Sequence, residues 1–128
     1  MKKLFIAIII LIPIGISFLP VIATKMADAA FDKPEDKHSP EALKRALQID
    51  TGMFLHSIAR PIAEKAIIFF PESTDMDYFV YTAAICSTRD GKPEAAQYWY
   101  QRFVDIYPKH PWTQQARNNL NKLKELNR

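Results

Sequence analysis

The 128-residue chain contains one cysteine, Cys86, and only three glycines. A single cysteine excludes an internal disulfide, and no CxxC pair or zinc-ligand spacing is present. Cys86 lies in an apolar segment of helical character, so we expect it to be a small buried hydrophobic residue. Runs of alternating polar and β-branched residues are also missing after residue 39, which indicates an all-α domain.

The sequence also lacks the motifs of common catalytic and nucleotide-binding sites. It has no GxGxxG, P-loop, GxSxG or HExxH pattern, and its acidic pairs have no spacing typical of acid–base catalysis. Lys and Arg number 17 against 14 Asp and Glu, and setting aside Lys2 and Lys3 leaves a nearly balanced charge. We therefore predict a non-enzymatic protein without a cofactor, metal, small-molecule substrate or nucleic-acid partner.

His56 leaves one alternative of a different class. A buried histidine can ligate a pigment or haem, which would suit a subunit of a redox assembly. The other two histidines, His38 and His110, lie 18 residues before and 54 residues after it, and no neighbouring residue completes a set of ligands. An absorbance spectrum of the purified protein would test this alternative.

The one long apolar segment covers residues 4–23 and follows Lys2 and Lys3. As a helix these residues extend about 30 Å, which matches the hydrocarbon core of a bilayer. The basic start predicts a cytoplasmic N-terminus, so the rest of the chain would lie on the periplasmic or extracytoplasmic side. We predict that residues 1–23 form a single-pass transmembrane anchor.

A cleaved signal peptide is the competing interpretation of the same segment. The small residues of Val21-Ile-Ala23 and Ala27-Asp-Ala29 fit the rule for a cleavage site. The apolar run is longer than the core of a typical signal peptide, which favours retention. Residues 24–38 are polar, of mixed charge and interrupted by Pro34, so they predict a linker between membrane and domain.

Prolines punctuate the remaining chain, which we predict to be a helical domain over residues 39–128. Pro40 and Pro93 suit the first turn of a helix, whereas Pro71 and Pro108 each follow an apolar helix end. These positions predict about five helices, over residues 40–50, 53–70, 74–89, 93–107 and 111–126.

The segment from Gly91 to Pro108 carries the clearest motif. Gly91, Ala96, Tyr100 and Pro108 stand at the relative spacings of the glycine, alanine, aromatic and proline positions of a tetratricopeptide repeat. The longer pattern with Phe103 and Tyr107 resembles the repeats of two kinds of bacterial envelope protein, the TolA-binding cell-division coordinator and the outer-membrane-assembly lipoprotein. The departures are Phe103 in place of a small residue, Ser87 in place of an aromatic, and a poor match over residues 41–71.

The resemblance implies a binding surface, because the first helix of each such hairpin lines the concave face of the repeat array. By position it assigns Tyr78, Tyr81, Ile85 and Arg89 to a candidate groove for a peptide or partner helix. Tyr78 and Tyr81 could equally cover the next hairpin. The first hypothesis is a membrane-anchored scaffold or accessory subunit of a larger membrane or envelope complex, and the second is a secreted periplasmic adaptor released by cleavage.

Overall fold

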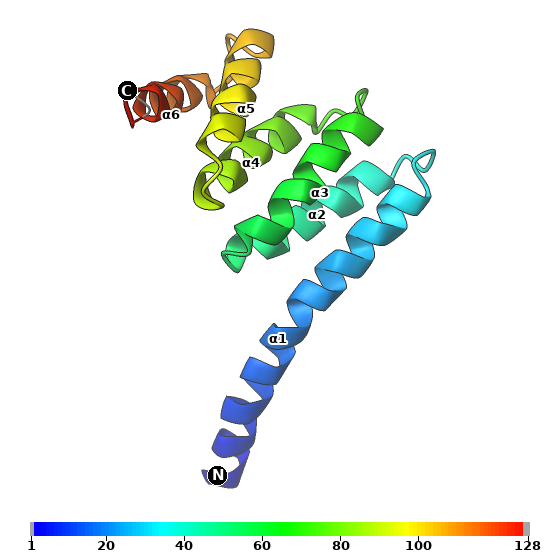
Figure 1. Ribbon diagram of the computed structural model, residues 1–128. Helices are drawn as coiled ribbons and strands as arrows, with labels where there is room; N and C mark the ends of the chain where they lie inside the picture. Colours follow the sequence, from blue (N-terminus) through cyan, green and yellow to red (C-terminus); the bar gives the residue numbers. More distant parts are fainter. Residues whose placement is uncertain (1, 127–128) are drawn as a thin grey trace.

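The computed structural model describes residues 2–126, which form six α-helices and no strand (Figure 1). The all-α prediction and the long apolar N-terminal helix are confirmed, and six helices rather than about five make up the described chain. Residues 127 and 128, the last of the expected domain, lie outside the described part. The helices are α1 (Lys2–Asp32), α2 (Ser39–Gly52), α3 (His56–Phe69), α4 (Met76–Arg89), α5 (Pro93–Ile106) and α6 (Thr113–Leu126).

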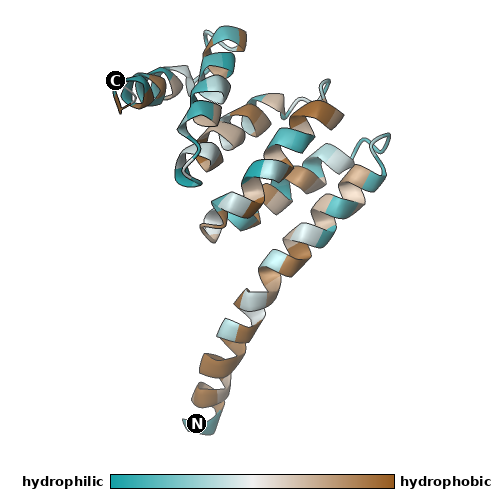
Figure 2. Ribbon diagram, in the orientation of Figure 1, coloured by the Kyte–Doolittle hydropathy of each residue, from teal (hydrophilic) through white to brown (hydrophobic). Residues whose placement is uncertain are grey.

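Helix α1 continues from the apolar segment into the domain without a break, through Pro13 and Pro20 (Figure 1). Its first half is exposed, whereas Ala23, Ala27 and Ala30 are buried in the core that α1 shares with α2. Figure 2 shows the same division, with the hydrophobic half of α1 extending away from the rest of the molecule.

The prediction of a linker over residues 24–38 is therefore wrong for residues 24–32, which belong to α1. The three alanines recur at steps of four and three, so they form a narrow apolar stripe among charged neighbours. Packing of that stripe on α2 stabilises a helix that the polar composition conceals. The helix ends at Asp32, just before Pro34, because the residue that precedes a proline disfavours helical geometry.

The five shorter helices recur at a constant interval. The even-numbered helices α2, α4 and α6 begin at Ser39, Met76 and Thr113, which are 37 residues apart. Helices α3 and α5 begin at His56 and Pro93, which are also 37 residues apart. Each helix has 14 residues. Short turns follow α2 and α4, and the latter contains Gly91 with φ +70°, a conformation that favours glycine.

The buried residues of the odd-numbered helices repeat one pattern. Each of these helices buries three residues at the spacing i, i+4, i+7. The triplet of α5 follows that of α3 by 37 residues, the triplet of α3 follows that of α1 by 36, and only α5 has larger side chains than alanine at two of the positions. Helix α1 thus occupies the place before α2 that α3 occupies before α4. The triplets are Ala23, Ala27 and Ala30 in α1, Ala59, Ala63 and Ala66 in α3, and Ala96, Tyr100 and Phe103 in α5.

Helix α4 joins two hydrophobic cores. One face, with Phe79, Ala83 and Cys86, packs with α1, α2 and α3. The other face, with Val80 and Ala84, packs with α5 and α6. The domain is therefore built by stacking each helix on the preceding one, and α4 fixes the orientation of the last two.

Candidate binding hollow between helices α4, α5 and α6

A hollow of about 390 Å³ lies where α6 meets α4 and α5. Its walls combine aromatic, aliphatic and amide side chains, which suits recognition of a segment with both apolar and polar groups. It is lined by Tyr81, Ile85, Thr88 and Arg89 of α4, Tyr100 of α5, and Gln115, Asn119, Lys122, Leu123 and Leu126 of α6.

Three of the four residues assigned to the groove meet at this hollow, and one does not. Tyr81, Ile85 and Arg89 recur at steps of four along α4, so they share one face of the helix. Tyr78 instead packs against the core of α1 to α4, and the Lys44 ammonium lies 5.3 Å from the centre of its ring. The reason is position along the helix, because α2 packs against α4 whereas the hollow opens toward α6.

Tyr81 also supports the fold. Its ring centroid lies 5.3 Å from that of Phe103 and 5.1 Å from that of Trp112, in edge or tilted arrangements that favour aromatic contact. Burial raises the pKa of the Tyr81 hydroxyl, with the nearby Tyr100 adding to the effect. Tyr81 therefore forms a wall of the hollow and covers the following helices at the same time.

The charged side chains of the hollow are both basic, Arg89 and Lys122. Among residues 2–126 neither of them forms an ion pair. Burial lowers the pKa of His56 most, and the positive charge of Arg89 lowers this pKa further. The hollow thus offers two cations beside apolar walls, and its chemistry matches an anionic group attached to an apolar one.

The contribution of α6 was missed in the sequence. Gln115, Asn119 and Lys122 stand at i, i+4 and i+7, a polar stripe beside the buried residues of the same helix. The Asn119 amide donates a hydrogen bond to the Tyr100 hydroxyl at 3.2 Å, which ties α6 to α5. The stripe is visible in the sequence, but only the packing of α6 shows that it faces Arg89.

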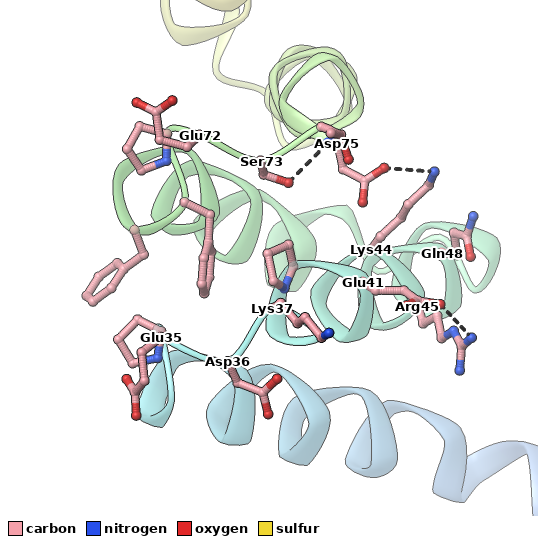
Figure 3. Close-up of a pocket in the computed structure, with 16 residues that line it drawn as sticks. Glu35, Asp36, Lys37, Glu41, Lys44, Arg45, Gln48, Glu72, Ser73 and Asp75 are labelled. Atoms are coloured by element: carbon pink, nitrogen blue, oxygen red, sulfur yellow. Dashed lines mark hydrogen bonds and ion pairs between the residues drawn. The ribbon is translucent and has the colours of Figure 1, made fainter.

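A larger and more open hollow of about 820 Å³ lies at the opposite end of the domain (Figure 3). The loops before α2 and before α4 line it together with α2. Several of its charged groups neutralise one another, since Lys44 pairs with Asp75 at 3.2 Å and Arg45 with Glu41 at 2.8 Å. This hollow therefore offers less unbalanced charge for a partner than the hollow beside Arg89.

His56 lies at the start of α3, with its Nδ1 atom 3.7 Å from the Cys86 sulfur. Burial lowers the pKa of His56 and raises the pKa of the Cys86 thiol to about 12. In the part of the chain described here, no group of three His, Cys, Asp or Glu residues is placed to hold a metal ion. The geometry thus pairs His56 with a protonated thiol, which is a poor metal ligand.

Comparison with known proteins finds no relative, because no family model, no curated protein and no solved structure matches this chain.

Proposed function

We propose that this protein is a non-catalytic, membrane-anchored adaptor of tetratricopeptide-like design. Residues 4–23 span the membrane with the N-terminus in the cytoplasm, and the domain stands on the periplasmic or extracytoplasmic side. The domain binds another membrane or envelope protein as an accessory or scaffold subunit of a larger complex. The hollow beside Arg89 receives a segment of that partner.

The division of α1 into an exposed apolar half and a packed half carries this proposal. Residues 4–18 of α1 are exposed, although nearly all of them are apolar. Exposed apolar surface of this extent is unfavourable in water and favourable in a bilayer. The packed half also argues against the secreted alternative, since cleavage after Ala29 would remove Ala23 and Ala27 from the core.

The 37-residue interval supports the helical-repeat design. Two further observations support the proposal: Ala96 and Tyr100 are buried, and Gly91 lies in the turn between two helices. The interval is three residues longer than that of the tetratricopeptide repeat.

Partner capture from detergent-solubilised source membranes tests the hollow. Arg89→Ala should weaken capture by a factor of about 10 to 100, because a charge-assisted hydrogen bond contributes about 1.5–3 kcal/mol. Arg117→Ala is the matched control, since Arg117 is an exposed arginine outside the hollow. Equal capture by both variants and the unmodified chain would remove the hollow from the proposal.

The anchor is tested separately by carbonate extraction and by the mass of the intact protein. Retention in the membrane with residues 1–23 present is expected. A protein released by carbonate that begins at Thr24 or Ala30 would contradict the anchor and favour the secreted adaptor.

A further inference from the structure

The turn between α2 and α3 presents an apolar surface without a partner in the fold. Phe54 is 79 % exposed, and Ile58 in the first turn of α3 is 42 % exposed. Residues 51–59 contain no Asp, Glu, Lys or Arg, and the preceding Asp50 is fully buried. The turn therefore offers two exposed apolar side chains with no charge between them, a composition that suits contact with an apolar environment.

The backbone holds Phe54 in this exposed position. Its φ angle is +59°, in the left-handed region that residues other than glycine seldom adopt. Leu55 donates its amide hydrogen to the Asp50 carbonyl oxygen at 2.8 Å, which closes the turn. The fold therefore directs the ring outward at a cost in backbone strain, a combination that commonly marks a functional position.

The position of this turn along α1 indicates what covers it. Helices α1 and α2 are antiparallel, so the end of α2 lies beside an earlier part of α1 than Ala23 (Figure 1). Leu19 and Pro20 are the first half-buried residues of α1, which places the turn at about their level. They lie three or four residues inside the apolar segment that ends at Ala23, about 5 Å at 1.5 Å per residue.

The opposite end of the domain carries charged side chains. The loops before α2 and before α4 lie far from the first half of α1 (Figure 1) and carry charges of both signs, with Asp36, Lys37 and Glu72 among them (Figure 3). Desolvation of these charged side chains in a bilayer would be costly, whereas the uncharged turn can enter it. Lys25, exposed just beyond the apolar segment, stands where lipid phosphates would lie.

From this placement we infer that the α2–α3 turn is a second membrane contact, in which Phe54 enters the boundary between headgroups and acyl chains beside α1. The occupant of the apolar surface is thus lipid rather than a protein partner. This inference rests on the proposed membrane span of α1. The contact would give the domain two points of attachment to the bilayer and so one fixed orientation.

Labelling the full chain in vesicles tests the inference. The vesicles contain equal parts of phosphatidylcholine and phosphatidylglycerol, and a nitrobenzoxadiazole label is attached to Phe54→Cys, Ile68→Cys or Ile12→Cys. Ile68 is the matched control, because it is 74 % exposed at the other end of α3. The unmodified chain is the blank, since its one cysteine is buried.

The label at position 54 should lose most of its emission to doxyl groups carried on lipid and little to aqueous iodide, whereas the label at position 68 should do the reverse. Circular dichroism of each labelled chain confirms that the helices remain. Iodide quenching at position 54, with position 12 still quenched by doxyl lipid, overturns the second contact and leaves the anchor standing. Iodide quenching at position 12 overturns the anchor and the inference together. Protection of position 54 from both quenchers shows a covering protein and overturns the lipid contact.

Discussion

At the scale of single residues, Asp50 is the most unexpected side chain of the core. It is fully buried, and neither carboxylate oxygen has a hydrogen-bond partner among the described residues. Burial raises the pKa of this carboxyl above its ordinary value of 3.8. Ser87, one interval of 37 residues later, is also buried with an unpaired hydroxyl, so the repeat preserves a polar position in the core.

We expect Asp50→Asn to stabilise the domain near neutral pH by about 1–2 kcal/mol, because the amide is neutral at every pH and avoids the cost of burying an ionised carboxylate. Because the folded-state pKa lies above the unfolded one, the ionised carboxyl destabilises the fold as pH rises above its ordinary pKa of 3.8. Below that pH both states are protonated, so the gain should disappear at about pH 3. Thermal unfolding at the two pH values measures the difference. Asp28→Asn, on an exposed residue, is the control and should change little.

At the scale of elements, proline and glycine positions predicted the helices of the domain closely. Every predicted end of the five helices after residue 39 lies within three residues of the ends of α2 to α6. The continuation of α1 was missed because Ala23, Ala27 and Ala30 form its buried stripe, and alanine among charged residues gives a weak hydrophobic signal. The first repeat matches the motif poorly because the 37-residue interval preserves burial rather than residue type. Ala63, for example, corresponds to Tyr100.

The seam between α1 and α2 depends on the small size of those alanines. We expect Ala27→Leu to destabilise the domain by about 1–3 kcal/mol, since a larger side chain in a packed core forces its neighbours apart. Ala29→Leu is the matched control, because Ala29 lies on the exposed side of the same helix. Thermal unfolding in detergent compares the two variants. Equal unfolding temperatures would contradict close packing of α1 on α2.

At the scale of the whole molecule, the sequence predicted part of the candidate site. The resemblance to the repeat assigned Tyr81, Ile85 and Arg89 to one groove, and these three residues line one hollow. Tyr78 was assigned by resemblance to that groove and lies elsewhere, because α2 reaches the first part of α4. Lys122 was missed because its place depends on how α6 packs on α4, which no local pattern encodes.

The two halves of α1 predict different effects of truncation. A chain that begins at Ala23 should remain folded and dissolve without detergent, since the removed residues contact little of the domain. A chain that begins at Lys33 should unfold at a temperature roughly 10 °C lower, because α2 loses its cover and each kcal/mol lost lowers the Tm of such a domain by about 4–8 °C. Similar unfolding temperatures for the two fragments would show that residues 23–32 are a tether after all.

The unbroken course of α1 connects the proposed membrane span directly to the domain. Its 31 residues measure about 46 Å from end to end at 1.5 Å per residue. A change in tilt of about 20°, within the range of spanning helices, would move one end sideways by about 16 Å relative to the other. A partner that tilts the span inside the bilayer would thus swing the hollow beside Arg89 without touching it, and a ligand in that hollow would pull on the span.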